Sequence, residues 1–97
     1  MTKARAQFIY QLQGIILGRQ LKIASPHSKY AGQEYYNLQT TLENQPNKVI
    51  QVFKDKLTNP AIWEIIQQGQ CFKKQYLFKC RNQRGHYYLV DWEEVKE

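Results

Sequence analysis

Residues 70–84 read QCFKKQYLFKCRNQR, and this stretch carries five basic residues and no acidic one. Three aromatic residues lie between the charges: Phe72, Tyr76 and Phe78. Even spacing of this kind is typical of a β-strand. The last residues of the stretch and the glycine after it, Asn82–Gly85, form a short polar segment that precedes a second aromatic run, HYYLVDW at residues 86–92. Because four such residues ending in glycine favour a tight turn, we predict that the two runs form a β-hairpin.

The pattern leaves open which face of the first hairpin strand is buried. One face carries Phe72, Lys74, Tyr76, Phe78 and Cys80, and the other carries Lys73, Leu77, Lys79 and Arg81. The aromatic face has two interpretations, as part of the core or as a platform on which flat ligands stack. Along the second strand, Tyr88, Val90 and Trp92 are expected to oppose Tyr87, Leu89 and Asp91.

Three strands are expected before the hairpin. Residues 8–24 form a long β-rich run, in which Gly14 and Gly18 indicate a bend or a bulge. Residues 25–33 form a loop, and residues 34–43 alternate in the manner of a half-buried strand. The predicted core face of that second strand holds Tyr36, Leu38, Thr40 and Leu42.

A turn at residues 44–47 and a third strand at residues 48–57 come next, followed by one helix. Thr58 or Asn59 is suited to cap this helix, Pro60 fits its first turn, and Gly69 ends it. Its apolar stripe consists of Ile62, Ile65 and Ile66, with Trp63 at the margin.

The order of three strands, one helix and two strands is typical of an all-β fold, the OB-fold. This is a five-stranded Greek-key barrel, here with one short helix between strands three and four. We predict an OB-fold domain over residues 8–97 and a flexible N-terminus over residues 1–7. Ligands of such barrels bind on strands two and three, between two flanking loops. Those loops are Ala24–Gly32 and Asn82–Gly85 in this chain.

The distribution of charge indicates the kind of partner. The 97 residues include 14 basic and 8 acidic side chains, a formal net charge of +6. Residues 91–97 hold four acids and one lysine, so residues 1–90 carry 13 basic residues against 4 acidic ones. A field of this sign attracts a polyanion and speeds its encounter with the protein.

Other classes of protein are disfavoured. No apolar run of 18 residues occurs, so we expect no membrane span. The basic N-terminal residues lead into no signal-like apolar segment, and we expect a cytoplasmic location or an organellar nucleoid. Cys71 and Cys80 are the only cysteines. Their odd separation along one predicted strand places them on opposite faces, as apolar fillers and not as a disulfide.

The sequence also contains no recognisable catalytic arrangement. His27 and His86 are the only histidines, and neither has a serine or cysteine at motif spacing. No phosphate-binding glycine motif and no cluster of metal ligands occurs. We therefore expect no enzymatic activity, no catalytic residue, no metal and no cofactor.

Several segments resemble the single-stranded-DNA-binding protein superfamily of bacteria and organelles. YQLQGIIL at residues 10–17 resembles its first strand, with Gly14 as the bulge glycine. LKIASPHSKYAGQEYYNL at residues 21–38 resembles the first loop and second strand. VIQVFKDKL at residues 49–57 and IWEIIQQGQCF at residues 62–72 resemble the third strand, the helix and the opening of the fourth strand. The chain looks closer to the short members, such as the primosomal replication protein of the priB type and the small proteins of cyanobacteria and plastids.

The resemblance implies an OB-fold that binds single-stranded DNA and assembles as a homodimer or homotetramer, with replication proteins as further partners. The tryptophans that the superfamily carries on its binding strands are absent. Trp63 falls in the helix and Trp92 late in strand five, so both are predicted to be core residues. Tyrosine and phenylalanine would then supply the stacking surfaces.

Binding of a single strand needs cations along the phosphates and flat side chains under the bases. The predicted phosphate contacts in the hairpin are Lys73, Lys79, Arg81 and Arg84, with Lys29, Lys48 and Lys54 as outlying contacts. The predicted stacking residues are Tyr30, Tyr35 and Phe53. The function expected from the sequence is non-enzymatic binding of single-stranded nucleic acid, DNA before RNA, in replication, repair or recombination. The alternative is an OB-fold module that docks a replication or assembly partner.

Overall fold

The computed structural model describes residues 9–43 and 45–96. Its elements are β1 (Tyr10–Ile23), β2 (Glu34–Leu42), β3 (Gln45–Val52), the 3-10 helix η1 (Lys54–Lys56), α1 (Ala61–Gln67), β4 (Gln75–Gln83) and β5 (His86–Val95). The N-terminal residues 1–7, predicted to be flexible, lie outside the described residues.

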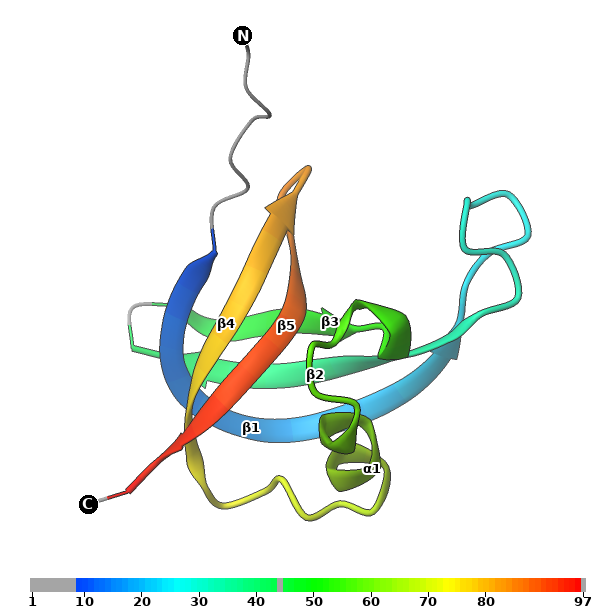
Figure 1. The fold of residues 1–97 in the computed structure, drawn as a ribbon. Coiled ribbons are helices and arrows are strands. Elements are labelled where there is room, and N and C mark those ends of the chain that lie inside the picture. Colours follow the sequence, from blue (N-terminus) through cyan, green and yellow to red (C-terminus); the bar gives the residue numbers. More distant parts are fainter. Residues whose placement is uncertain (1–8, 44, 97) are drawn as a thin grey trace, which may run out of the picture.

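The strands form a closed barrel in the order β1-β2-β3-β5-β4, and β4 pairs back with β1 (Figure 1). Neighbouring strands are antiparallel except β3 and β5, which pair in parallel where Ile50 faces Tyr87 and Gln51 faces Tyr88. The single α-helix, α1, lies between β3 and β4 in the chain. This arrangement confirms the prediction of an all-β, five-stranded Greek-key barrel of the OB type.

β1 bends so that its first part pairs with β4 and its later part with β2. Residues Tyr10–Ile15 pair with β4, residues Gly14–Ile23 pair with β2, and the register shifts between Ile16 and Gly18. Gly14 is therefore paired on both sides at once, with Leu42 and with Tyr76. A Cβ atom at this position would overlap the backbone oxygen of Thr41, so only glycine allows the approach.

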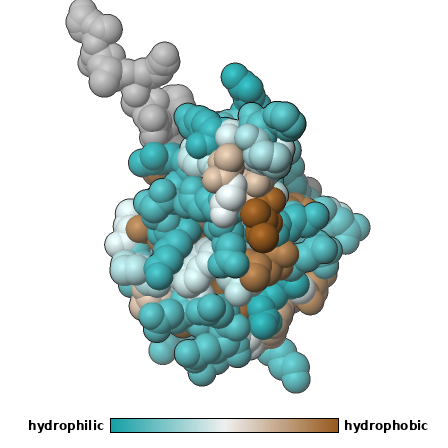
Figure 2. Space-filling view, turned by 90° about the vertical axis from the view of Figure 1, so that its right-hand side faces the viewer, coloured by the Kyte–Doolittle hydropathy of each residue, from teal (hydrophilic) through white to brown (hydrophobic). Residues whose placement is uncertain are grey.

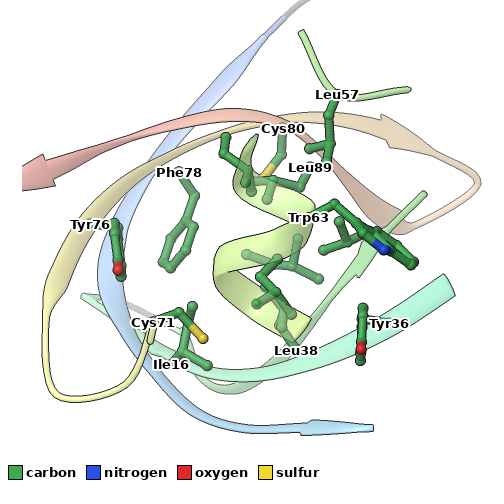
Figure 3. Packing of buried hydrophobic residues seen from close by; sticks show 14 of the residues in the cluster. Ile16, Tyr36, Leu38, Leu57, Trp63, Cys71, Tyr76, Phe78, Cys80 and Leu89 are labelled. Carbon is green, nitrogen blue, oxygen red and sulfur yellow. The ribbon is translucent and has the colours of Figure 1, made fainter. Parts of the chain in front are cut away.

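The core face of β2 is the predicted one, since Tyr36, Leu38, Thr40 and Leu42 are all buried. The buried face of β4 is the aromatic one. Tyr76, Phe78 and Cys80 point into the barrel (Figure 3) and are at most 3% exposed. The Tyr76 ring stacks on Trp92, with 4.2 Å between ring centroids. The aromatic face of β4 is therefore part of the core, and Tyr76 offers no free face for a ligand.

α1 covers the lower end of the barrel in Figure 1. The Asn59 side-chain oxygen accepts a hydrogen bond from the Ala61 amide (3.1 Å), and Gly69 leaves the helix with φ of 73°. Ile62, Trp63 and Ile66 are buried in the core. The helix is therefore where the sequence predicts it, and Trp63, at the margin of its apolar stripe, is the buried core residue that was expected.

Several predicted strand bounds are wrong. The turn expected at residues 44–47 belongs largely to β3, which begins at Gln45; Asn44 is not among the described residues. The third strand ends at Val52, and η1 replaces its expected continuation to residue 57. The fourth strand begins at Gln75 and not at Gln70, because Lys73 just before it has a positive φ of 67°.

The prediction that the cysteines face opposite sides is wrong for the same reason. Cys71 precedes β4 and enters the core from the segment after α1, whereas Cys80 enters it from β4. Both are free thiols with no exposed surface. Their role as small apolar fillers is the one expected from the sequence.

The simple alternation expected along the last strand is also wrong. Lys79 pairs with Asp91, but the next residue, Cys80, pairs with Leu89, so Val90 is the extra residue of a β-bulge. Consequently the consecutive residues Leu89 and Val90 are both buried. Tyr88 and Val90 line a common recess, as their expected shared face implies, whereas Trp92, expected on that same face, packs against the core cluster.

The close approach at Gly14 predicts a large effect of a single methyl group. Gly14→Ala should lower the free energy of unfolding by about 1–3 kcal/mol, because backbone of β1 and β2 must separate. Gly18→Ala is the matched control, since its Cβ would meet only the end of the Gln39 side chain at 3.0 Å. Urea denaturation measures both. Equal effects of the two substitutions would contradict this account of the close approach.

Burial of two titratable core groups predicts a loss of stability at alkaline pH. Burial raises the pKa of Tyr76 from 10.0, and that of Cys80 from 9.0, to about 12. The folded-state pKa values are the higher ones, so this contribution is complete below about pH 9 and is lost as pH rises towards 12. Urea denaturation should give a lower free energy of unfolding at about pH 10.5 than at pH 8, with a smaller difference in Cys80→Ala. The same free energy at both pH values would show the prediction to be wrong.

Candidate nucleic-acid interface

Four aromatic residues gather on the outside of the barrel. They are Tyr30 in the loop after β1, Tyr35 on β2, Phe53 after β3 and Tyr88 on β5, and together we call them the aromatic cluster. Phe53 is at its centre. Its ring centroid lies 4.7 Å from that of Tyr35, 5.0 Å from that of Tyr30 and 5.9 Å from that of Tyr88.

The members of the cluster differ in what they can offer a ligand. Phe53 is only 4% exposed, and the Tyr35 ring stacks on it at an interplanar angle of 13°. It supports the other rings and has no free face, contrary to the stacking role predicted for it. Tyr30, Tyr35 and Tyr88 are half-buried. The exposed parts of these three tyrosines form the accessible surface of the cluster.

Lys56 lies against two of these rings. Its ammonium nitrogen is 4.9 Å from the ring centroid of Tyr30 and 5.6 Å from that of Tyr88. A hydrogen bond with Lys56 lowers the pKa of the Tyr30 hydroxyl, against the smaller opposing effect of burial. A second ammonium group, that of Lys29, lies 5.6 Å from the Tyr30 ring centroid. Cations and aromatic faces are thus already paired at this surface.

A cleft of about 850 Å³ lies between the two loops that the OB-fold prediction identified. Its lining comes from the first loop (His27, Ser28, Lys29, Tyr30) and from the β4–β5 hairpin (Gln83, Arg84, His86, Tyr88). A smaller recess beside it, lined by Lys56, Arg81, Gln83, Tyr88 and Val90, shares Tyr88 with the cleft. None of the side chains that line these two spaces is acidic.

Local structure holds both walls of the cleft. In the first loop, the Ser28 hydroxyl donates to the Ser25 carbonyl (3.0 Å) and accepts from the Tyr30 amide (3.2 Å). In the hairpin, Arg84 and Gly85 both have positive φ values, 54° and 84°. Two such residues form the tight hairpin turn whose twist matches that of the strands. The Gly85 amide also donates to the Asn82 side chain (3.2 Å).

The sheet beside the aromatic cluster carries a row of amide side chains. Gln20 of β1, Asn37 of β2 and Gln51 of β3 are paired across the three strands. Asn37 lies two residues beyond Tyr35 on the same face. Its side-chain oxygen is buried and has no hydrogen-bond partner among the described residues. This row extends the cluster with groups that donate and accept hydrogen bonds.

The structure brings together six of the ten residues that the sequence predicted for the site. These are Lys29, Tyr30, Tyr35, Phe53, Arg81 and Arg84. Lys54 is apart from them, in a recess that also holds the acidic Glu34 and Asp55. Lys73 belongs to the segment that connects α1 to β4, and this segment runs along the end of the barrel that α1 covers (Figure 1).

Lys79 and Lys48 also lie outside this group. The Lys79 ammonium donates to Glu93 Oε2 at 2.7 Å, and this hydrogen bond raises the lysine pKa. Nearby, Lys74 lies 3.8 Å from Glu94. Acidic residues of β5 therefore pair with Lys74 and Lys79, whereas no acidic side chain lines the cleft or the recess beside it. Lys48 contacts Tyr87 at a different part of the barrel.

Two important residues were missed. Lys56 is indistinguishable from Lys54 in the sequence KDK, and only the turn of η1 directs it towards Tyr30 and Tyr88. Tyr88 was assigned to one face with Val90 and Trp92, and the bulge at Val90 leaves Tyr88 outside while Trp92 packs on the core. An aromatic pair next to a hairpin turn was the only signal available for Tyr88.

Two other features concern the part of the chain that the structure describes, namely clusters of metal ligands and membrane-spanning helices. No group of three or more potential metal ligands occurs there. No helix within residues 9–43 and 45–96 is both long and apolar enough to cross a membrane. Comparison of the chain with family models, with curated proteins and with solved structures gives no significant match.

The contact between Lys56 and Tyr30 predicts a pKa change that can be measured. Lys56→Met should raise the pKa of the Tyr30 hydroxyl, because the hydrogen bond and the positive charge that lower it are removed. Lys54→Met, which removes the same charge from the other side of η1, should leave it unchanged. A pH titration of the Tyr30 ring carbon by NMR provides the measurement. An unchanged Tyr30 pKa in Lys56→Met would show that the contact does not exist in solution.

Proposed function

We propose that this protein binds single-stranded nucleic acid, chiefly DNA, through the aromatic cluster and the adjoining cleft, as a relative of the single-stranded-DNA-binding superfamily. The observation that carries the proposal is that Tyr30 and Tyr88 line the cleft and its recess together with four cations, Lys29, Lys56, Arg81 and Arg84. Tyr35 adjoins them through its stack on Phe53. Stacking surfaces and cations in one groove are what a single strand requires.

Bases stack on the tyrosines, and each stacked base contributes roughly 1–3 kcal/mol. Tyr35 is suited to this role because Phe53 fixes its ring from one side. Lys56 leaves the faces of Tyr30 and Tyr88 when a base arrives and contacts the neighbouring phosphate. A base thereby replaces Lys56 as the partner of each ring, and the positive charge of Lys56 remains at the site.

Cations around the cleft set the dependence on salt. Four phosphate contacts on a single strand give a slope of log affinity against log salt of about −3. The amide row through Asn37 offers hydrogen bonds to base edges or sugars. His27 and His86 line the cleft beside Ser28, whose hydroxyl is engaged in loop hydrogen bonds. The role that we propose for these two histidines is binding and not catalysis.

The corresponding cellular role is the handling of single strands in replication, repair or recombination, in the cytoplasm or an organellar nucleoid.

The proposal also includes assembly of the protein into a homodimer or homotetramer. Among the described residues, no strand pairs with the other edge of β1 beyond Ile15. Leu17, Leu21 and Ile23 on this part are 58%, 49% and 66% exposed. Figure 2, which faces the end of β1, shows a brown hydrophobic patch surrounded by polar residues.

The same β1 edge favours a second candidate function, a module that docks a protein partner. In that case the edge and its apolar side chains bind the partner, and the aromatic cluster is not required. The two functions are distinguished by whether an oligonucleotide binds and whether it binds at the cluster.

Fluorescence anisotropy with labelled oligo-dT at low salt tests the proposed function. We expect binding at micromolar protein or below, weakening steeply as salt is raised. Oligo-rU measured alongside gives the preference between DNA and RNA. Absence of binding to either oligonucleotide at micromolar protein overturns the proposal.

A pair of double variants tests the location. Arg81→Ala with Arg84→Ala should weaken binding of every sequence and reduce the salt slope by about 1.4, since two phosphate contacts are lost. Lys73→Ala with Lys74→Ala removes the same charge near the opposite end of the barrel and is the matched control. If the control loses as much affinity and as much slope, binding depends on net charge and not on the cleft.

A further inference from the structure

The consecutive residues Tyr87 and Tyr88 carry cations on opposite sides of β5. Tyr88 belongs to the aromatic cluster, where Lys56 lies against it. Tyr87 lies against a different lysine, Lys48 of β3, whose ammonium nitrogen is 4.9 Å from the ring centroid. A third residue, Tyr10 of β1, meets Tyr87 edge to face with 5.9 Å between centroids and 70° between planes. Tyr10, Lys48 and Tyr87 form a second group of aromatic rings and a cation, which we call the mouth group.

Strand register places the mouth group at one end of the barrel. Tyr10 pairs with Cys80, Lys48 pairs with Thr40, and Tyr87 pairs with Ile50. All three partners are fully buried. Because paired residues share a face of the sheet, the mouth group projects from the same side as the core. β1 and β5 both begin at the top of Figure 1, away from α1.

The mouth group combines a covered ring with an accessible one. Tyr87 is half-buried and packs on the core cluster. Tyr10 is 44% exposed, so much of its ring is open to a ligand. An exposed ring held by a second ring, with an ammonium group beside it, is the combination that accepts one base and one phosphate.

The two groups are neighbours through the β4–β5 hairpin. Arg81 is paired with Tyr88 and Asn82 with Tyr87, so the hairpin base joins the recess beside the cleft to the mouth group. A bound nucleic-acid strand that leaves this recess over the hairpin therefore passes next to Tyr87. Two cations lie along this route: Arg81 lines the recess, and Lys48 lies against Tyr87.

We propose that the mouth group is a second stacking site for single-stranded nucleic acid, at which one nucleotide places its base on Tyr10 and its phosphate on Lys48. This inference rests on the proposed function of the aromatic cluster. It extends the bound strand beyond the cleft, around the hairpin and onto the end of the barrel. A short oligonucleotide fills the aromatic cluster alone, and only a longer one reaches the mouth group.

The test compares Tyr10→Ala with wild type on oligonucleotides of about 5 and about 15 nucleotides, within the range that one OB-fold binds. Tyr10→Ala should bind the long strand roughly fivefold or more weakly, as expected for one lost base stack, and the short strand as wild type does. Tyr10→Phe keeps the ring and should restore binding of the long strand. Lys48→Ala should show the same dependence on length, and it provides a second readout if Tyr10→Ala alters the fold.

The outcomes separate this inference from the function on which it rests. If wild-type protein binds neither oligonucleotide, the proposed function itself fails. If wild-type protein binds both, and the Tyr10 and Lys48 variants bind both equally well, the second site does not exist. If the variants bind the short and the long oligonucleotide more weakly by the same factor, the inference is also overturned, because the mouth group would then not lie at the far end of the bound strand.

Discussion

The close approach of the strands at Gly14 is the constraint on which the rest of the molecule depends. Gly14 is paired with β2 on one side and with β4 on the other. At this point β1 leaves one neighbour for the other, and the sheet closes into a barrel. Closure brings the loop after β1 and the β4–β5 hairpin to the same cleft, although more than fifty residues separate them in the chain. The candidate site is thus a consequence of barrel closure more than of any local motif.

Closure also decides how the aromatic residues are shared between core and surface. The chain contains two consecutive tyrosine pairs, and the alternation of a strand divides each of them. Tyr36 enters the core beside Trp63, while Tyr35 stacks on Phe53 outside. Tyr87 packs towards the core, while Tyr88 joins the aromatic cluster. Both outer rings pack on Phe53, so little side-chain freedom remains to be lost when a ligand binds.

Local patterns predicted much of the fold and part of the site. The alternation of β2, the helix between Pro60 and Gly69 and the hairpin at Asn82–Gly85 are properties of short segments, and the structure has them. Tyr30, Tyr35 and Arg84 followed from loop position and face. What failed depends on partners distant in sequence. Lys79 was assigned to phosphate because its partner Glu93 lies on another strand. The burial of Phe53 depends on rings from a loop and two other strands, and the bulge at Val90 depends on the register with β4.

The central claim is that single-stranded nucleic acid lies on the tyrosines between the two loops. NMR spectra of the tyrosine rings, recorded while an oligonucleotide is added, test this most directly. The account predicts that the ring signals of Tyr30, Tyr35 and Tyr88 shift together and saturate, while the buried rings of Tyr36 and Tyr76 change little. Saturable binding that leaves Tyr30, Tyr35 and Tyr88 unshifted, with changes confined to the exposed edge of β1, would contradict it.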